Sequence, residues 1–248
     1  MNEVISTLMN HRSYRSYSDR PVPSETIETI IRAAQAAPSW VHGQQVSVIS
    51  VRDPERKRKL SGLSGNQKHV DEAPVFLVFC MDFGRANTAC RMEGQPFPAA
   101  DDADLLLVGA TDVGIALAGA IAAAESLGLG TIPIGGIRRR TEEVISLLEL
   151  PAYVFPIAGL CVGYPGAETP QSPRLPLETV LHEERYREVT EAELEAYNAT
   201  FRGWLKEQGQ QERNWTSRIA GFYNANPSYG DSPKTLRRQG FTCGNMKG

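Results

Sequence analysis

Residues 105–124 read LLLVGATDVGIALAGAIAAA, and this stretch decides the fold. It is long enough to raise the question of a membrane-spanning helix. Asp112 lies near its middle, however, where a carboxylate costs about 2.5–3.5 kcal/mol on insertion scales, and the apolar residues are mainly alanine and glycine. We therefore expect a helix over residues 102–127 that is apolar on nearly all sides and is buried in a large core or in a subunit interface.

The composition around this stretch is that of a globular protein. The chain has 248 residues, of which 41% are hydrophobic and 22% charged, so it is large enough to bury one substantial core. Its net charge of −3 offers no general attraction to nucleic acids or to anionic membranes. The four cysteines form neither a CxxC pair nor a Cys/His ligand set, and the N-terminus does not resemble a secretory signal. We expect a cytoplasmic protein with reduced thiols, no metal site, and no nucleic-acid or membrane partner.

Short apolar runs on either side of the central stretch predict strands. VSVISV at 46–51, VFLVFCM at 75–81 and VFPIAGLCV at 154–162 are short and rich in β-branched or aromatic residues. Helices are expected at 2–10, 54–63, 141–148, 191–208 and 215–222, and from Ser24, whose side chain would cap its helix. Glycine and proline predict a loop over 82–101. Because the strands do not alternate regularly with helices, we expect an α+β fold in a single domain and not a doubly wound sheet.

Four polar or glycine-rich segments are candidates for a binding site. HRSYR at 11–15 concentrates guanidinium, imidazole and hydroxyl donors, and arginine offers a bidentate fork for a phosphate or a carbonyl-rich ring edge. A polar loop covers 62–70, and GLGTIPIGGIR at 128–138 has glycines where a backbone turns or approaches a flat ligand, without GxGxxG spacing. PRLP at 173–176 holds an arginine between prolines, which suits a phosphate. Each segment by itself is equally typical of an ordinary solvated turn.

Taken together, the segments resemble the nitroreductase superfamily. HRSYR, GNQKHV at 65–70, AAESLGLGTIPIGGIR at 123–138 and PRLP occur in the order and at about the spacing of that family. The resemblance is closest to the oxygen-insensitive NADPH nitroreductases and NADPH-flavin oxidoreductases. It implies a three-layer α-β-α sandwich with a mixed, mainly antiparallel sheet, a long buried helix and a C-terminal helical extension, in a homodimer. The implied parts are an FMN-binding core over 1–185 and an extension over 186–248 that completes the dimer and the active site.

The resemblance also assigns roles to residues. Non-covalently bound FMN would be contacted along its phosphate, ribityl chain and ring by His11, Arg12, Ser13, Arg15, Ser39, Gln67, Pro133, Ile134, Gly135, Gly136 and Arg174. Arg15 would also support the negative charge of the reduced flavin, and no side chain would act as a nucleophile. NADPH would be the co-substrate, with NADH as the alternative; Arg138 and Arg213 would lie near the NADPH phosphate, and Trp40 near the substrate.

The implied activity is hydride transfer from NADPH through FMN N5 to nitroaromatics, quinones, azo compounds or free flavin, with ping-pong kinetics. Two alternatives stay open. One is a superfamily member with a specialised substrate, acting in dehalogenation or flavin fragmentation. The other is a flavin-binding redox sensor without catalytic turnover.

Three residues depart from the pattern of this branch. Ser172 stands where a lysine often precedes the PRLP arginine, which removes one positive charge from the phosphate site. Trp40 replaces a small hydroxyl residue, so it either narrows the acceptor pocket or packs at the dimer interface. Pro133 replaces an expected aromatic residue. The charge lost at Ser172 predicts a shift in FMN affinity or in the choice of nicotinamide.

Overall fold

A computed structural model describes residues 2–225 and 231–246 of the chain. The chain divides into two compact units, one of residues 1–169 and 229–248 and the other of residues 170–228. The expected C-terminal extension, 186–248, includes residues 226–230 and 247–248, which lie outside the described residues. Each unit is described below by itself.

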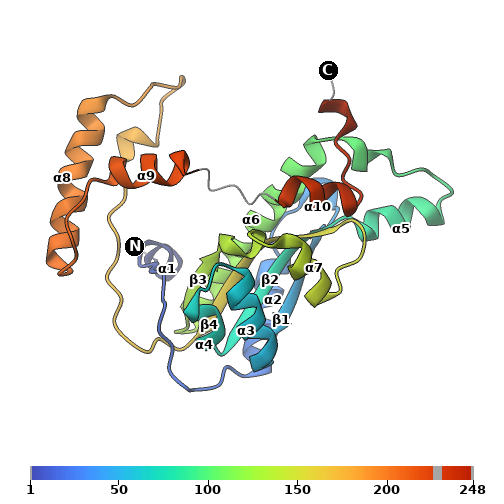
Figure 1. The fold of residues 1–248 in the computed structure, drawn as a ribbon, viewed down its shortest axis with the longest axis horizontal. Coiled ribbons are helices and arrows are strands. Elements are labelled where there is room, and N and C mark those ends of the chain that lie inside the picture. Colours follow the sequence, from blue (N-terminus) through green and yellow to red (C-terminus); the bar gives the residue numbers. More distant parts are fainter. Residues whose placement is uncertain (1, 226–230, 247–248) are drawn as a thin grey trace. The chain divides into compact units, whose positions relative to one another are not determined.

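The first unit holds the sheet and most of the helices (Figure 1). Its strands are β1 (Val46–Val51), β2 (Val75–Asp82), β3 (Gly130–Ile134) and β4 (Val154–Gly163). Its α-helices are α1 (Glu3–Met9), α2 (Ser24–Gln35), α3 (Pro54–Leu63), α4 (Lys68–Glu72), α5 (Gly84–Met92), α6 (Asp104–Ser126), α7 (Thr141–Leu148) and α10 (Ser232–Arg238). Short 3₁₀ turns are η1 (Trp40–His42), η2 (Pro98–Asp101), η3 (Gly135–Arg138) and η5 (Gly244–Met246).

The sheet has the strand order β1-β2-β4-β3, with antiparallel pairing between each pair of neighbours. Among the described residues, parallel pairing occurs at the isolated bridge between Ser13 and Thr131. The predicted α+β class and the mainly antiparallel pairing are confirmed, and the mixed character of the sheet is confined to that bridge. β1 and β3 are the two edge strands, and β3 is therefore open to the N-terminal segment.

The central strand β2 is buried along its whole length because helices cover both faces of the sheet. Its alternate residues Leu77 and Phe79 pack with α2 and α6, through residues such as Ile30 and Val113. The intervening residues of β2 point to the opposite face of the sheet, toward α3, α4 and α7. There Phe76 and Val78 belong to the same hydrophobic cluster as Leu60, Val70 and Val144. This alternation is what a strand buried on both faces requires.

Helix α6 is buried along one face only. The buried positions follow helical spacing: Leu105, Gly109, Asp112, Val113, Ala116, Ala120 and Ala124. Gly109 lets the helix approach β2 closely, since a Cβ there would lie 2.9 Å from Met81 Sδ. On the other side Leu107 is 66% exposed and Ile115 is 39% exposed. Within one chain the core therefore covers only one side of α6, and burial of the other side in a subunit interface stays a prediction. By length and composition α6 could cross a membrane, a test that a core helix also passes.

Three local expectations need correction. Ser24 does not cap α2; it lies in the first turn, and Pro23 at the N-cap position makes no side-chain bond. The expected loop 82–101 contains α5 and the turn η2. At the start of α5 the Asp82 carboxylate accepts the Gly84 N–H at 2.9 Å. The polar loop 62–70 runs into α4, which begins at Lys68. The predicted bounds of β1, α3 and α7 are confirmed.

The second unit contains η4 (Leu177–Thr179), α8 (Glu191–Glu207) and α9 (Trp215–Asn224), which confirms the two predicted polar helices. Thr190 and Glu193 form a reciprocal capping box at the start of α8. The Arg187 guanidinium and the Thr190 donors bond the Glu193 carboxylate and lower its pKa to about 2. Asn198 on α8 bonds Thr216 on α9 through both its amide atoms, and this pair joins the two helices.

The C-terminal segment 231–246 packs on the first unit. Gln239 donates from Nε2 to the carbonyl oxygens of Pro151 at 3.0 Å and Val154 at 2.8 Å. Phe241 is buried, and its ring meets Phe83 and Tyr153 edge-on at centroid distances of 6.0 and 6.2 Å. These contacts tie the end of the chain to the start of β4.

Candidate functional site

The HRSYR segment lies along the open edge of β3. Ser13 bridges Thr131 in parallel, and the Tyr14 N–H donates to the Thr131 carbonyl oxygen at 2.9 Å. Gly130 makes this approach possible, because a Cβ at that position would lie 2.6 Å from Tyr14 Cγ. The segment is therefore held in register with the strand that leads to Pro133–Gly136.

A buried carboxylate fixes the first residue of the segment. His11 donates from Nδ1 to Glu125 Oε1 at 2.7 Å, and Thr131 Oγ1 donates to the same oxygen at 2.8 Å. The Glu125 side chain is only 10% exposed, so its charge needs these two donors. The sequence did not single out Glu125 as a site residue, although it lies in the AAESLGLG motif that carried the resemblance.

Two guanidiniums of the segment keep most of their donors free. Arg12 donates to the Asn10 carbonyl oxygen at 3.3 Å, and Arg15 donates to the Ser13 carbonyl oxygen at 3.2 Å. Neither forms an ion pair with a carboxylate among residues 2–225 and 231–246. Two unneutralised arginines three positions apart can bind an anion.

The second polar segment meets η3 through Gln67. The Gln67 amide donates from Nε2 to the Ser64 carbonyl oxygen at 2.8 Å, and Oε1 faces His69 Nε2 at 3.0 Å. A methyl group on Gly136 would overlap both Gln67 Nε2 and the Ser64 oxygen, so glycine is required at that position. The structure thus brings Gln67 against the Gly135–Gly136 turn.

Three of the four predicted segments converge at the β3 edge: HRSYR, the 64–69 segment and 133–136. Ser13 bridges Thr131 on β3, and Gly136, just beyond the end of β3, lies against Gln67 and Ser64. Burial lowers the pKa of His69 most, the positive charge of Arg15 lowers it further, and Glu72 opposes both.

The end of β3 offers a flat backbone surface. Pro133 is exposed, Ile134 is buried, and Gly135 is partly exposed. Proline has no N–H, and its place on an edge strand leaves no ladder bond missing. Gly136 is buried, and Gln67 and Ser64 occupy the space that a side chain there would need, so a planar ring could approach the backbone only at the partly exposed Gly135.

Arg138 follows directly after the glycine turn. Its guanidinium donates to the Ile157 carbonyl oxygen on β4, and its own carbonyl oxygen accepts the Thr141 hydroxyl at 2.9 Å. One of its donors thus serves the fold, and its predicted contact with the NADPH phosphate stays a prediction.

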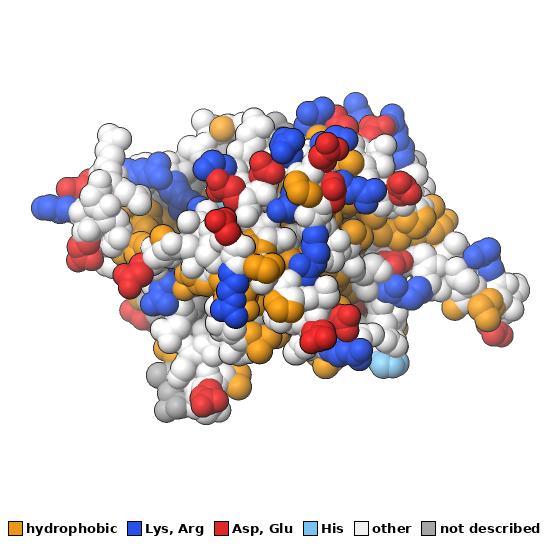
Figure 2. All heavy atoms as spheres, turned by 90° about the horizontal axis from the view of Figure 1, so that it is seen from below, with side chains coloured by type: hydrophobic (Ala, Val, Ile, Leu, Met, Phe, Trp, Pro, Cys, Tyr) orange, Lys and Arg blue, Asp and Glu red, His pale blue; other side chains and the backbone are white. Residues whose placement is uncertain are grey.

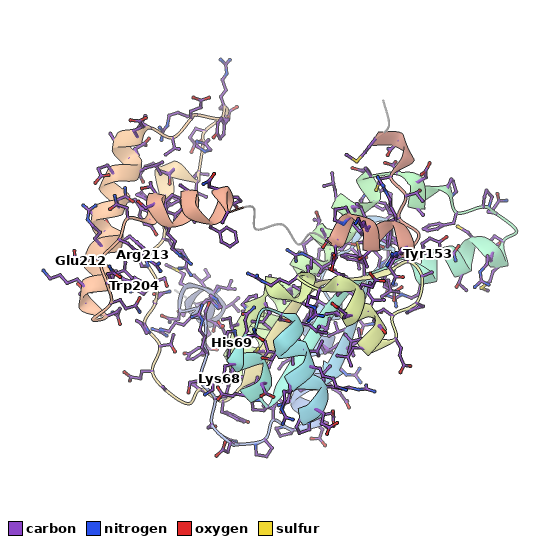
Figure 3. All side chains as sticks on the ribbon, viewed as in Figure 1. Lys68, His69, Tyr153, Trp204, Glu212 and Arg213 are labelled. Atoms are coloured by element: carbon purple, nitrogen blue, oxygen red, sulfur yellow. The ribbon has the colours of Figure 1, made fainter. Side chains whose placement is uncertain are left out.

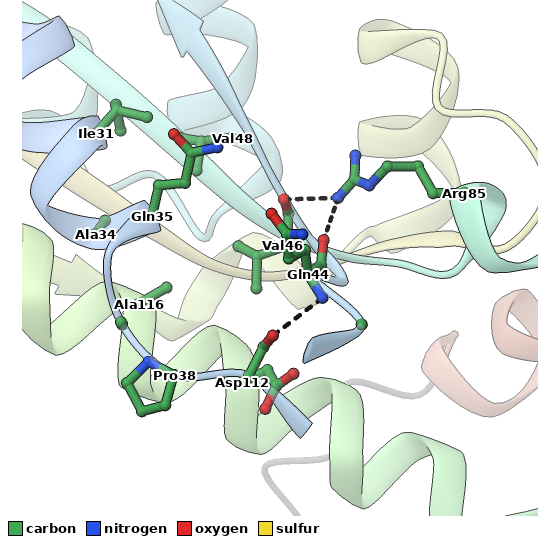
Figure 4. A pocket seen from close by; sticks show the side chains of 13 residues that line it. Ile31, Ala34, Gln35, Pro38, Gln44, Val46, Val48, Arg85, Asp112 and Ala116 are labelled. Atoms are coloured by element: carbon green, nitrogen blue, oxygen red, sulfur yellow. Dashed lines mark hydrogen bonds between the residues drawn. The ribbon is translucent and has the colours of Figure 1, made fainter. Parts of the chain in front are cut away.

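Ser39 and Trp40 lie elsewhere in the first unit. They precede β1, the strand at the opposite edge from β3, and strands about 4.8 Å apart separate the two edges by roughly 14 Å. Ser39 borders a cavity of about 460 Å³ between α2, β1 and α6, whose lining also includes Gln35, Gln44, Arg85 and Asp112 (Figure 4). Within one chain the structure does not bring Ser39 and Trp40 to the converged segments.

The turn that carries Trp40 is strained and firmly anchored. Val41, His42 and Gln44 have φ values of 46°, 56° and 50°, a left-handed conformation that costs roughly 1–3 kcal/mol per residue. The Asp112 carboxylate accepts the Trp40 N–H at 3.2 Å, and Arg85 donates to the Gln44 carbonyl oxygen at 2.7 Å. As a result Trp40 is presented outward and is 56% exposed.

The PRLP segment belongs to the second unit. Arg174 is exposed and donates from Nη1 to the Ser172 carbonyl oxygen at 2.7 Å, while the Tyr197 hydroxyl holds the Pro173 carbonyl oxygen at 3.0 Å. Arg213, labelled in Figure 3, is exposed in the segment between α8 and α9. The roles predicted for both arginines stay predictions.

The converged residues fit FMN. Arg12 and Arg15 can neutralise a phosphate or an electron-rich ring edge, the Gln67 amide adds a directional donor, and the partly exposed Gly135 has no side chain to hinder a flat ring. The face drawn in Figure 2 shows blue and red side chains intermixed, so the basic groups do not merge there into one extended basic surface.

The fold and this site define an α+β protein with an antiparallel sheet, whose β3 edge carries Arg12, Arg15 and Gln67. The Nitroreductase family model matches residues 8–164, and the model of the C-terminal domain of the Nitroreductase family matches residues 172–244. The chain belongs to the nitroreductase family.

Relatives of known activity and structure span nearly the whole chain. It is 47% identical to the FMN reductase [NAD(P)H] of Bacillus subtilis, over 97% of this chain and 98% of that protein. It is 38% identical to the oxygen-insensitive NADPH nitroreductase of Salmonella typhimurium, over 88% and 90% of the two chains. The structure of B. megaterium NfrA2 superposes with a TM-score of 0.95 at 47% identity, covering 97% of this chain and 98% of that one.

Proposed function

We propose that this chain is an FMN-dependent NAD(P)H oxidoreductase that reduces nitroaromatics, quinones, azo compounds or free flavin. The observation that carries the proposal is the convergence of Arg12, Arg15, Gln67 and the Gly135–Gly136 turn at the β3 edge of a nitroreductase-family fold. Relatives named as FMN reductase and NADPH nitroreductase support the same activity.

When bound, FMN would supply the hydride chemistry, receiving reducing equivalents from NAD(P)H and delivering them to an acceptor in a ping-pong cycle. The chain's own residues would bind and orient. The exposed Arg15 would stabilise negative charge at the ring edge, and the Gln67 amide would donate a hydrogen bond there. His11 and Ser13 would face the phosphate and ribityl chain, with His11 held by Glu125.

We further propose that the working form is a homodimer. The apolar side of α6, with Leu107 and Ile115, is exposed in one chain and would be covered by a second copy. The same assembly would explain the strained turn, because Ser39 and Trp40 of one chain could then complete the site of the other. Trp40 would narrow the acceptor pocket or pack in that interface.

The remaining roles are proposed as the family resemblance implies them. The sheet with α2 and α6 on one face and α3, α4 and α7 on the other would be the three-layer sandwich, with the FMN-binding core over 1–185 and the extension 186–248 completing the dimer and site. Arg174 would bind the phosphate, and Arg138 and Arg213 would face the NADPH phosphate. A cytoplasmic location stays a prediction from the sequence.

Spectroscopy of the purified full chain tests the proposal. The protein should be yellow, or should take up FMN and become yellow, and anaerobic stopped-flow mixing with NADPH or NADH should bleach it. A panel of oxidants should then restore the colour and identify the acceptor. A yellow protein that neither nicotinamide bleaches would be a flavin-binding redox sensor, and a chain that neither contains nor binds FMN would overturn the proposal.

A further inference from the structure

The Gln67 side chain lies between two groups that fix the orientation of its amide. The Ser64 carbonyl oxygen can only accept a hydrogen bond, so the Gln67 atom 2.8 Å away must be the nitrogen Nε2. The same nitrogen lies against Gly136, at a position that a Cβ on that residue would overlap. The amide oxygen Oε1 therefore points to the other side, toward α4.

This orientation determines the tautomer of His69. Its Nε2 lies 3.0 Å from Gln67 Oε1, and an amide oxygen only accepts, so Nε2 must carry the hydrogen. Burial and the charge of Arg15 lower the pKa of His69, while Glu72 partly opposes them. At neutral pH the ring is thus uncharged, with a hydrogen on Nε2 and none on Nδ1.

The neighbouring residue on α4 takes no part in this arrangement. Lys68, labelled beside His69 in Figure 3, is largely exposed and pairs with Glu72 one turn further along the helix. Of the two Gln67 amide hydrogens, one is used by Ser64, and the other has no partner among residues 2–225 and 231–246. A single directed donor is thus left over at the point where the three segments converge.

We propose that His69 is a positioning residue of the flavin site: it locks the Gln67 amide so that Gln67 presents one N–H donor, and not its carbonyl, to the ring edge. This inference rests on the proposed function, because it takes the ligand at the β3 edge to be a flavin. If the donor from His69 were lost, Gln67 could rotate away from its contacts with Ser64 and Gly136. Gln67 would then spend part of the time with an acceptor where the site needs a donor.

The tautomer can be measured without altering the chain. In two-bond ¹H–¹⁵N spectra of the ligand-free protein near pH 8, above the ordinary histidine pKa of about 6.5, His69 should show a protonated Nε2 and an unprotonated Nδ1. His11 provides the internal contrast, because its Nδ1 donates to Glu125 and must be the protonated atom. The chain has 4 histidines, so variants such as His69→Gln and His11→Asn assign the signals. A His69 ring protonated on Nδ1 alone would overturn the proposal.

A double-mutant cycle on FMN binding separates positioning from a merely structural effect. His69→Leu should weaken FMN binding about three- to tenfold, the effect of one hydrogen bond, and His69→Gln, which keeps a side-chain N–H donor, should restore it to within about twofold. In a Gln67→Ala background, His69→Leu should change the dissociation constant by less than about twofold. Circular dichroism and thermal melting of each variant would verify the fold.

The outcomes distinguish this inference from the proposed function. If the unaltered chain binds no FMN, the proposed function fails and the tautomer measurement still decides the state of His69. If the chain binds FMN and His69→Leu weakens binding equally with and without Gln67, His69 does not act through Gln67 and the inference is wrong.

Discussion

His11 and Glu125 join the N-terminal segment to the end of α6 through a bond of 2.7 Å between Nδ1 and Oε1. Thr131 Oγ1 reaches the same oxygen, so one carboxylate connects the HRSYR segment, the long helix and the edge strand. A buried acceptor that serves two donors cannot be removed without leaving both unsatisfied.

Glu125→Ala is therefore expected to lower the free energy of unfolding by about 1–3 kcal/mol and to weaken FMN binding several-fold. Glu125→Gln, which keeps an acceptor for Thr131, should cost less. Urea unfolding followed by FMN titration measures both effects, with the exposed Glu212→Ala as the control. An alanine variant as stable as the unaltered chain would contradict the importance of this bond.

Arg15→Ala is expected to keep the fold, because the side chain is exposed and its hydrogen bond is to the neighbouring Ser13 carbonyl oxygen. The rate constant for flavin reduction by NADPH should fall about 10- to 100-fold, less than for a buried donor because solvent screens the charge. Stopped-flow absorbance measures the rate. The control Arg58→Ala, exposed on α3, should react normally, and normal kinetics in Arg15→Ala would remove Arg15 from its assigned role.

Gly136→Ala should destabilise the fold by about 1–3 kcal/mol, since the added methyl group overlaps Gln67 and Ser64 and has no space to occupy. Gly203→Ala on α8 is the matched control, because nothing lies within 4 Å of a Cβ there. In that helix interior alanine should add about 0.5–1 kcal/mol of stability. Equal effects of the two substitutions in denaturant titrations would show that the 136 position is not crowded.

His69 should make stability depend on pH below neutrality. Burial and Arg15 lower its pKa in the folded chain, so the unfolded chain binds the proton more readily. As the pH falls through about 6.5, the free energy of unfolding should decrease, and this contribution should level off once folded His69 is itself protonated. Unfolding curves at several pH values should show a weaker decrease for His69→Gln, whereas the exposed control His42→Gln should follow the unaltered chain.

Leu107→Arg tests the dimer. A charge on the exposed side of α6 should shift the mass measured by light scattering from twice 27.2 kDa toward that of one chain. Met92→Arg, on an exposed position of α5, should leave the mass unchanged. A single-chain mass for the unaltered protein would refute the homodimer.

Local patterns were sufficient to predict most of the elements. β1, α3 and α7 follow from short β-branched runs, from Pro54 at a helix start and from apolar helical spacing, all of which act over a few residues. α5 was missed because the glycines and prolines around it suggested a loop, whereas the Asp82 carboxylate that starts it is contributed by the end of a strand.

The site was predictable in part, for a related reason. The sequence motifs identified Arg15, Gln67 and Gly136, and the fold brings their segments together. Glu125 and His69 act through other side chains, and those contacts exist only after the sheet edge and α4 have formed. The distance between Trp40 and the β3 edge could not be predicted either, because it depends on the order of the strands in the sheet.

The return of residues 231–246 to the first unit makes residues 170–228 an insertion tethered at both ends, and not a free tail. A truncation before Gln239 would remove the donor that serves the carbonyl oxygens of Pro151 and Val154, and it would expose the aromatic surface that Phe241 covers. Engineering of this chain should therefore place fusions after the last residue and keep the segment that follows α10, since removing it would loosen the core.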